Sequence, residues 1–590
     1  MLLKTLLFSF VLFLSGGSFC QIMTSNGAVI TVAGATLQVN GGLSLTNSSS
    51  LANNGIIVVS KNSTFPLAGT FVNGSASAVS GNGGYRVEQD WINDAAFNSG
   101  ASTVELFGNT QQFITSTNST VTTFNNLKLT GTGSGTNRKK TLQLVNAFTG
   151  IAGNLEINDR ELETQTNSFF VLNPSPAALT TTAVPGSEGF VSSLSPGVLS
   201  RETNSTSAYL YPTGSSAGTP RYRPVNIIPN NATAAVYTAR MNNQDATAAG
   251  FDRSVTDGSM CTENPLFFHS IERTSGTAPA DIRLYYITAS DGSWSGIAHW
   301  RTANAQWNDI AANIPGTAGV FETRMRTAWA FANPGHPYIL SNIRPEPPFI
   351  SCPVICENST GNEFTLTGNS TTYQWTVPGN GTITSGQGTD AIEASWTTGT
   401  GYVYAIATGA NGCNSLPDSC QPSVFPQPVA QFSYVDGANG FEFSDNSPGA
   451  TLWDWSFGDG NTSANENPVH QYNGGGIYTV ILAVSNAGGC SATTTQLVTV
   501  DEKVVVPNVF SPNSDGINDF FTVTSGGLKT YSLYIVNRWG NEVFKSDNPS
   551  LHWDGKSNGN ECDEGVYFYT LKASSASKEY EYQGMVTLIK

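Results

Sequence analysis

An oxygen-rich loop near the C-terminus is the best candidate for metal chemistry in this sequence. Asn513, Asp515 and Asp519 place oxygen-bearing side chains at spaced positions around Gly516, as in the front half of a calcium-binding loop. The bidentate glutamate that closes an EF-hand loop is absent at its expected spacing. A network of Asx turns explains the same residues and is favoured. Calcium is therefore the one cofactor that the sequence suggests, with these three residues as its ligands.

Two motifs mimic catalytic sites. Residues 214–218 read G-S-S-A-G and satisfy the G-x-S-x-G pattern, but Pro212 precedes them and Pro220 follows, which argues against the helix that a nucleophile elbow requires. Residues 131–135 read G-T-G-S-G, yet no lysine follows the last glycine as in a phosphate-binding loop. Both segments are expected to be glycine-rich loops or turns.

Three carboxylates could serve a polysaccharide hydrolase or lyase. Asp159, Glu161 and Glu163 share one face if their segment is a strand, and paired carboxylates are the machinery of glycoside hydrolysis. Charge runs are usually solvated, so a solvated strand face is favoured. The histidines are scattered and expected to be structural: His269, His299, His336, His470 and His552. We therefore predict no catalytic residue, although activity in residues 21–345 stays open.

Four of the eight cysteines lie in one short region: Cys352, Cys356, Cys413 and Cys420. Such crowding in a secreted chain predicts disulfides. Zinc is the alternative, because the first two have a C-x3-C spacing. Structural zinc pairs usually lie on tight knuckles, whereas these flank Pro353 and two β-branched residues, so disulfides are favoured.

The composition indicates a secreted all-β protein with several domains. A chain of 590 residues exceeds the size of a single hydrophobic core, and only 12% of its residues are charged, about half the usual share. Glycine, serine, threonine and asparagine replace the charges, and no long window has helical periodicity. The net charge of −16 argues against a nucleic-acid partner, which would need basic patches, so we expect none.

The first 20 residues are predicted to be a signal peptide. Lys4 supplies the positive start, residues 6–14 are almost purely apolar, and this run is too short to span a bilayer. Ser18 and Cys20 fit cleavage before Gln21. Acylation of Cys20 is the alternative, and the bulky Phe19 disfavours it. No later segment is apolar for eighteen residues, so we expect no transmembrane segment in the mature chain.

Short apolar runs recur through residues 21–199, separated by turn residues. Such brief strands bury a face only by stacking, which predicts a β-solenoid-like repeat region; the runs include residues 29–32, 36–39, 43–45, 56–59 and 70–72. The amino-acid sequence of residues 103–131 also resembles repeats of large Bacteroidetes surface proteins. Longer strands rich in aromatic residues then predict an antiparallel β-sandwich over residues 200–345, and the proline-rich residues 344–348 form a stiff linker.

Two further sandwiches are expected beyond the linker. In residues 350–427 the order Cys356, Trp375, Cys413 resembles an immunoglobulin-like domain, which favours a Cys356–Cys413 bridge, with Cys352–Cys420 second. In residues 428–501 the run W-D-W-S-F-G-D-G ends at Gly460, and a Y-x-V strand follows at Tyr478. This segment resembles a PKD domain, which implies a spacer role.

Residues 505–590 combine strand-like runs with Gly and Asn turns, which predicts a small β-sandwich. Their blocks, including VPNVFSPNSDGINDFF and GVYFYTLKA, resemble the gliding motility-associated C-terminal domain, the type B sorting signal of the Bacteroidetes type IX secretion system. The resemblance implies that the secretion machinery at the outer membrane is the partner of this domain. The sorting signal would lie in the last strand, at Met585, Val586, Leu588, Ile589 and Lys590.

The sequence therefore predicts a structural or adhesion protein that is secreted or attached to the outer cell surface. Residues 21–345 would be the exposed part, with a glycan or another surface ligand as partner, and the two middle sandwiches would be spacers. The alternative is a secreted polysaccharide-active enzyme or carbohydrate-binding protein, because PKD-like spacers often accompany such domains. A concave site with convergent carboxylates or stacked aromatic rings in residues 21–345 would distinguish the two.

Overall fold

The computed structural model describes residues 5–6, 23–61, 68–182, 184, 186–311, 313–331, 337–368, 370, 372–575 and 578–590. The chain forms two compact units. The first consists of residues 1–346 with 408–416, and the second of residues 347–407 with 417–590. Of the predicted signal peptide only β1 (Thr5–Leu6) is described, and its cleavage site lies outside the described residues.

The all-β fold class is confirmed. The helical elements of the described residues are short: α1 (Thr288–Asp291), η1 (Gly135–Arg138), η2 (Pro176–Ala178) and η3 (Thr247–Ala249). No helix in the described part of the chain is long and apolar enough to cross a membrane.

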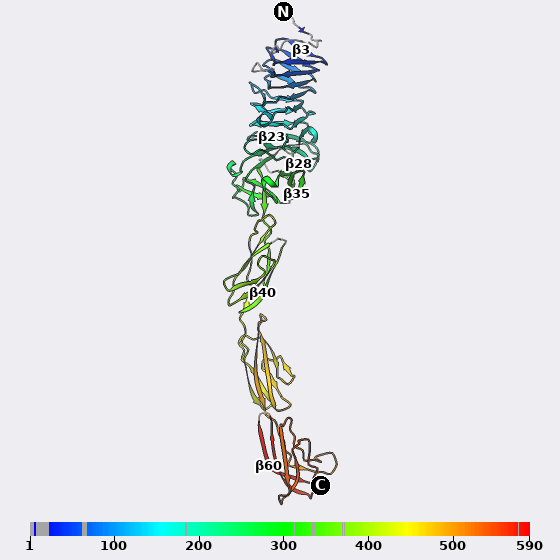
Figure 1. Ribbon diagram of the computed structural model, residues 1–590, viewed down its shortest axis with the longest axis vertical. Helices are drawn as coiled ribbons and strands as arrows, with labels where there is room; N and C mark the ends of the chain where they lie inside the picture. Colours follow the sequence, from blue (N-terminus) through cyan, green and yellow to red (C-terminus); the bar gives the residue numbers. More distant parts are fainter. Residues whose placement is uncertain are drawn as a thin grey trace. The chain divides into compact units, whose positions relative to one another are not determined.

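The first unit begins as a parallel β-solenoid, whose rungs stack between the labels β3 and β23 in Figure 1. One sheet contains β1, β3 (Val29–Val32), β6 (Ser50–Asn53), β9 (Ala78–Ser80) and β12 (Ala96–Asn98). The second contains β4 (Thr36–Asn40), β7 (Ile56–Ser60), β10 (Gly84–Val87), β13 (Thr103–Leu106), β16 (Asn126–Leu129), β19 (Leu155–Asn158) and β22 (Leu179–Thr181). The third contains β2 (Met23–Asn26), β5 (Leu43–Thr46), β8 (Phe71–Asn73), β11 (Trp91–Asn93), β14 (Gln112–Thr115), β17 (Lys139–Gln143), β20 (Glu161–Gln165) and β23 (Phe190–Ser193).

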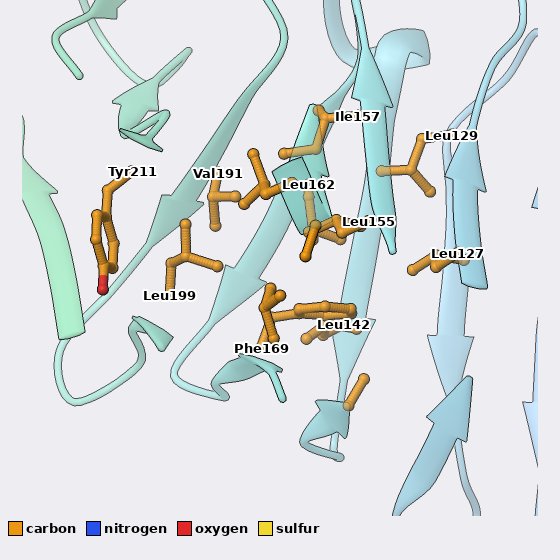
Figure 2. Packing of buried hydrophobic residues seen from close by; sticks show 14 of the residues in the cluster. Leu127, Leu129, Leu142, Leu155, Ile157, Leu162, Phe169, Val191, Leu199 and Tyr211 are labelled. Atoms are coloured by element: carbon orange, nitrogen blue, oxygen red, sulfur yellow. The ribbon is translucent and has the colours of Figure 1, made fainter. Parts of the chain in front are cut away.

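Alternating apolar residues give each rung its inward face. Leu43 and Leu45 of β5 point into the core, and Leu43 is in register with Phe71, which is in register with Trp91. The rings of Phe71 and Trp91 stack with centroids 4.3 Å apart. Figure 2 shows the same arrangement further along, where leucines of successive rungs meet around Phe169. Because each rung covers the apolar side chains of the next, strands of three to five residues are stable here.

The parallel ladder passes directly into an antiparallel sandwich. β24 (Leu199–Thr203) pairs in parallel with β21 (Phe169–Val171) and antiparallel with β29 (Ala235–Asn242). One buried core runs from Ile30 to Leu340 across both parts. The ten-stranded sheet through this transition contains β15 (Thr122–Phe124), β18 (Ala147–Thr149), β21, β24, β29, β31 (Phe268–Ser275), β37 (Pro337–Ile343), β33 (Gly296–Arg301) and β34 (Gln306–Asp309), with β30 (Met260–Glu263) on β37.

A five-stranded antiparallel sheet and a short hairpin complete the first unit. The sheet contains β25 (Tyr209–Tyr211), β28 (Val225–Pro229), β32 (Ala280–Tyr286), β36 (Phe321–Trp329) and β35 (Asn313–Ala318), and the hairpin β26 (Gly214–Ser215) and β27 (Arg221–Tyr222).

The second unit contains three consecutive β-modules, each with its own buried core. The first is built from β38 (Phe349–Ser351), β40 (Ser359–Thr367), β43 (Ala391–Trp396), β42 (Gly381–Ser385), β41 (Thr372–Thr376), β44 (Val403–Thr408), β45 (Asp418–Cys420), β39 (Val354–Cys356) and β46 (Ser423–Phe425). The next has β47 (Phe432–Gly437), β48 (Gly440–Asp445), β51 (Val469–His470), β50 (Thr462–Ser463), β49 (Leu452–Ser456), β52 (Gly476–Ser485) and β53 (Ser491–Val500). The last has β54 (Val509–Phe510), β60 (Glu579–Leu588), β59 (Gly565–Ser574), β55 (Thr530–Val536), β56 (Glu542–Ser546), β57 (Lys556–Ser557) and β58 (Asn560–Glu561).

Candidate functional site

A groove crosses one face of the ten-stranded sheet in the first unit. It consists of two adjoining hollows of about 400 and about 500 Å³ that share Pro196, Val198, Thr238 and Glu272. The first hollow is also lined by Phe170, Val171, Leu172, Ser200, Glu202, Val236 and Thr274. The second is also lined by Ser195, Arg240, Asn242, Gln244, Ala249, Phe251, Phe268, Ser270, Ile271 and Pro337. We call this surface the sheet groove.

The strand register places the polar side chains of the sheet groove in rows. Ser200 is opposite Thr238, and Thr238 is opposite Glu272, so three neighbouring strands present oxygen atoms in one line. Arg240 and Ser270 form the next row. Sequence reasoning missed this site because its residues come from several strands and the segments between them, and the sequence does not show which strands become neighbours.

The sheet groove also contains a guanidinium group, from Arg240, and an aromatic ring, from Phe170. Arg240 donates hydrogen bonds to the carbonyl oxygen of Gly197 (3.0 Å) and to Oδ1 of Asn242 (3.0 Å), and burial lowers its pKa. The ring of Phe170 stacks on Phe148 with centroids 4.4 Å apart. Carboxylates, hydroxyls, a fixed guanidinium group and an aromatic face together suit a ligand rich in hydroxyl groups.

The three carboxylates near residue 160 do not form a solvated face as expected. Glu161 is only 1% exposed and accepts a hydrogen bond from Oγ of Ser192 (2.6 Å). Glu163 is paired with Nζ of Lys139 at 2.6 Å. A hydrogen bond from Arg160 holds the pKa of Asp159 below its usual range. The prediction failed because Arg160, just before the strand, and Lys139, on the neighbouring strand, pair with this run.

The G-x-S-x-G segment is part of a hairpin. Gly214 and Ser215 form β26, which pairs antiparallel with β27 through Tyr222 and Arg221. A nucleophile elbow requires a strand that turns directly into a helix, and this geometry is different.

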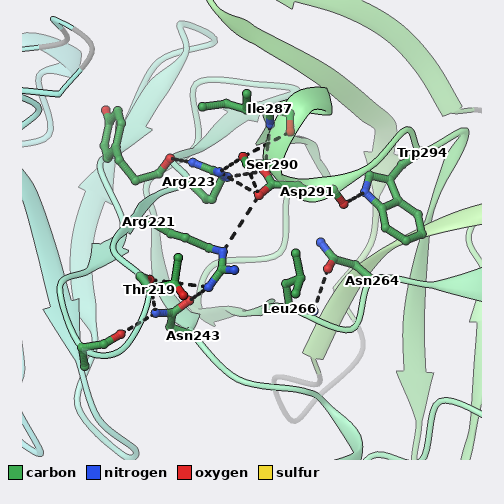
Figure 3. A network of polar contacts seen from close by, with 12 residues as sticks. Thr219, Arg221, Arg223, Asn243, Asn264, Leu266, Ile287, Ser290, Asp291 and Trp294 are labelled. Atoms are coloured by element: carbon green, nitrogen blue, oxygen red, sulfur yellow. Dashed lines mark hydrogen bonds and ion pairs between the residues drawn. The ribbon is translucent and has the colours of Figure 1, made fainter.

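A buried ion pair fixes the strand that follows this hairpin, as Figure 3 shows. Nη2 of Arg223 donates to Oδ1 of Asp291 at 2.7 Å, and Nη1 donates to the carbonyl oxygen of Tyr222 at 2.7 Å. Asp291 also accepts the backbone N–H of Ile287 at 2.8 Å. Since partners surround both charges, this network is structural: it locks α1 onto β27 and β28.

The His470 side chain of the WDWSFGDG module also has a packing role. Its Nε2 lies 2.8 Å from Oδ2 of Asp459, and its ring stacks on Phe457 with centroids 4.1 Å apart. Burial alone would raise the pKa of Asp459, but hydrogen bonds from Asn461 and His470 hold it below its usual range. His336 lies outside the described residues.

The cysteine pairing differs from the expected one. Cys356 is bonded to Cys490, and Cys413 is bonded to Cys261, so the expected Cys356–Cys413 bridge is wrong in this structure. The structure does contain the Cys352–Cys420 bond. The spacing of the cysteines favoured partners within one module. Two of the three bonds instead leave the module of residues 350–427: one reaches Cys261 in β30, and the other reaches Cys490 just before β53. Cys562 is free and buried, and burial raises the pKa of its thiol.

The loop proposed for calcium is closed by its own hydrogen bonds. Asp519 accepts the backbone N–H groups of Ser514 and Gly516 at 2.8 Å each, and Asp515 accepts that of Ile517 at 2.8 Å. Asn513 donates from Nδ2 to Asp515 at 3.0 Å. This is the geometry of the Asx-turn alternative. Calcium binding by these residues stays a prediction.

The final strand, β60, is an interior strand of the sheet in the last module. It pairs with β59 along ten residues and with β54 on its other side. Val586 and Leu588 are buried, whereas Met585 and Ile589 are exposed. Nζ of Lys590 pairs with Glu561 at 2.9 Å, which raises the pKa of the lysine. The predicted sorting residues therefore form two faces, one in the core and one available for contact.

Family comparisons agree with the C-terminal architecture. Residues 504–588 match the CHU_C type IX secretion signal domain, residues 432–500 match a PKD domain, and residues 345–421 match a PKD-like domain. The module expected to be immunoglobulin-like is thus similar to the PKD-like family. No curated relative matches the sequence.

Solved structures similar to the chain include two bacterial PKD domains. The PKD1 domain of Vibrio anguillarum Epp is 30% identical, with 13% of this chain and 94% of that chain covered and a TM-score of 0.12. The PKD1 domain of the Vibrio cholerae metalloprotease PrtV is 30% identical, with coverage of 13% and 98% and a TM-score of 0.12. Dimeric latent PorU from Porphyromonas gingivalis is 11% identical, with coverage of 41% and 32% and a TM-score of 0.12.

Proposed function

From the premise that this chain is a type IX secretion substrate with PKD-type modules, we propose that it is a structural and adhesion protein of the outer cell surface. The C-terminal domain delivers the chain, the two PKD-type modules act as spacers, and the first unit contacts the ligand. The proposal assigns no enzymatic activity to the chain.

The sheet groove is the observation that carries this proposal. It lies on a sheet whose opposite side packs into the continuous core of the first unit, and the strands β24, β29 and β31 hold its rows of polar side chains. Its rows of hydroxyl and carboxylate groups beside Phe170 suit a surface glycan, because sugars combine hydroxyl groups with apolar ring faces that pack on aromatic rings.

Binding by substituted full-length chains tests the proposal. The mature chain, residues 21–590, is applied to a glycan array, and the same variants are displayed on cells in an adhesion assay. Phe170→Ala and Glu272→Gln should each lower binding at least tenfold. Glu156→Gln is the matched control, because Glu156 is an exposed strand glutamate of the solenoid, paired with Lys128 at 3.2 Å, and lies outside the groove.

Unchanged adhesion in both groove variants would contradict the assignment of the groove. A second candidate function, a polysaccharide-active enzyme, is favoured by one observation only: Glu202 and Glu272 line the same hollow. Release of reducing sugar from a bound glycan, abolished by Glu202→Gln or Glu272→Gln, would support the enzyme instead of the adhesion protein.

A further inference from the structure

The three disulfides join end to end into one short covalent path through the middle of the chain. We propose that this path makes the protein a tension-bearing tether, which cannot be stretched between Cys261 and Cys490 while the disulfides are intact. This inference goes beyond the proposed surface role, and its test requires no ligand.

Each bond of the path is present within a single compact unit. Cys261–Cys413 lies in the first unit, with a Cα–Cα distance of 6.0 Å. Cys352–Cys420 and Cys356–Cys490 lie in the second, with Cα–Cα distances of 6.1 and 5.6 Å. Their sequence separations are 152, 68 and 134 residues, so the three loops overlap along the chain.

The overlap produces a shortcut. From Cys261 the path crosses to Cys413 and follows the backbone for seven residues to Cys420. It then crosses to Cys352, follows the backbone for four residues to Cys356, and crosses to Cys490. Two cysteines that are 229 residues apart (490 − 261) are thus joined through about 11 residues of backbone.

The shortcut decides where tension travels. An extended chain spans at most ~3.3–3.6 Å per residue, so the interval from Cys261 to Cys490 could stretch to roughly 80 nm without disulfides and to only about 6 nm with them. A force applied at the two ends of the chain therefore bypasses most of residues 262–489. The force therefore cannot unfold the sandwich strands after β30 or most of the two PKD-type modules by extending them.

The backbone pieces of the path are themselves part of the fold. Cys356 ends β39, which pairs in parallel with β46, and Cys420 ends β45, which pairs with β44. Cys490 is buried, and its backbone N–H donates to Oδ1 of Asn486 at 3.1 Å. Cys356 and Cys420 therefore lie at strand ends, whereas Cys352, Cys413 and Cys490 lie just outside the strands.

This arrangement suits a protein that is held at its C-terminal domain and loaded through its first unit. On the proposed function, a bound ligand would pull on the sheet groove and the surface attachment would resist, so the load has to cross the interval between Cys261 and Cys490. A covalent shortcut at this place keeps the spacers folded under load, and the oxidising environment outside the cell keeps it intact.

Single-molecule stretching of the mature chain, residues 21–590, tests the proposal. The chain is tethered through tags at its two ends and extended fully, first oxidised and then with dithiothreitol. Because only covalent connectivity sets the fully extended length, reduction should add about 74 nm. Peptide mapping under non-reducing conditions on the same sample should recover the three pairs.

Removing one bond at a time gives a distinct length for each part of the path. The Cys261–Cys490 interval should lengthen from about 6 nm to roughly 21 nm in C352S/C420S, roughly 28 nm in C356S/C490S and roughly 34 nm in C261S/C413S. Cys562→Ala is the matched control, because Cys562 is free and lies outside the path, and it should change no length.

Two results would overturn the tether. One is an oxidised chain that already reaches its reduced length. The other is an interval of roughly 57 nm, which is expected if the bonds are Cys352–Cys420 and Cys356–Cys413 and both stay within one module. Loss of glycan binding with the lengths unchanged would instead contradict the proposed function alone, so the two failures are distinguishable.

Discussion

Glu263 is a buried carboxylate that makes the stability of the first unit depend on pH. It lies in β30 opposite Ser341 and is 6% exposed. Burial raises its pKa from 4.5 to about 7, although Arg253 and Arg344 partly oppose this change. The folded state therefore keeps the proton over a pH range in which the unfolded chain releases it. The free energy of unfolding should fall as the pH rises from 4.5 to about 7.

Glu263→Gln should remove this dependence. The amide keeps the shape of the protonated acid, so we expect a higher melting temperature than wild type at pH 8 and nearly the same one at pH 4.5. The gain in the free energy of unfolding is up to about 3 kcal/mol. Differential scanning calorimetry across this range is the measurement, with Glu156→Gln as the exposed control. A variant less stable than wild type at pH 8 would contradict the raised pKa.

Trp455 should be the residue on which its PKD module depends most. It is fully buried, packs on Phe432 with centroids 5.0 Å apart, and donates from Nε1 to the carbonyl oxygen of Asn465 at 2.9 Å. Trp455→Ala should lower the free energy of unfolding by ~3–5 kcal/mol, the range for losing a large buried aromatic side chain. Chemical denaturation of the mature chain, followed by a probe in this module, is the measurement.

Asp459→Ala should cost less, about 1 kcal/mol, because it removes only hydrogen bonds of a turn. The bonds are those from the backbone N–H and from Nδ2 of Asn461, both at 3.0 Å, and from His470 at 2.8 Å. If Asp459→Ala or His470→Ala instead abolished glycan or metal binding and left the melting temperature unchanged, the module would be a binding site rather than a spacer.

Single residues were the hardest features to predict from the sequence. Leu43, Leu45, Trp455 and Phe457 are buried at alternate positions of their segments, and this period of a strand can be seen in the sequence. The partners of Cys261 and Cys490 are brought together by tertiary structure, and spacing along the chain contains no information on such contacts. Glu161 was expected in solvent, because its hydrogen-bond donor Ser192 and the nearby cation of Lys139 belong to neighbouring rungs of the solenoid, which the sequence does not place beside it.

At the scale of elements, we expect export to require a folded C-terminal domain, and β60 to be the strand on which that folding depends. Val586 is fully buried and Met585, its neighbour, is 59% exposed. Val586→Asp should unfold the domain and abolish export, because an unpaired charge in a core is strongly destabilising. Met585→Asp should leave the domain folded. Thermal melts and cell-surface labelling of both variants are the measurements.

The pair of variants separates two roles of the strand. If the machinery contacts the exposed face, Met585→Asp lowers surface labelling without changing the melting temperature. Export that persists in Val586→Asp with the domain unfolded would show that the folded strand is not required.

Elements were predicted well where local pattern and tertiary packing agree. The run at residues 29–32 is β3, and the runs at residues 36–39, 43–45 and 56–59 are contained in β4, β5 and β7. Residues 36–39 and 43–45 have apolar residues at alternate positions, and residues 29–32 and 56–59 are short and mostly apolar. Both patterns are typical of strands when turn residues flank them. The sheet groove could not be predicted, because it depends on which strands become neighbours and in which register.

At the scale of the whole molecule, the solenoid and the sandwich share one core, although the sequence suggested two separate parts. The division was expected where the strands lengthen near residue 200, but β24 belongs to both the parallel and the antiparallel ladder. A change of strand length marks a change of topology and does not require a break in the core. The C-terminal modules were recognisable because their motifs are continuous in the sequence.

Deletion of residues 582–590 shows whether the C-terminal domain delivers this chain to the outer surface. The deletion removes most of β60, and with it Val586 and Leu588 from the domain core. We expect the first unit to stay folded and to remain in the periplasm, protected from protease added to intact cells, whereas the full chain is digested at the surface. Equal digestion of the deleted and full chains on intact cells would contradict the account.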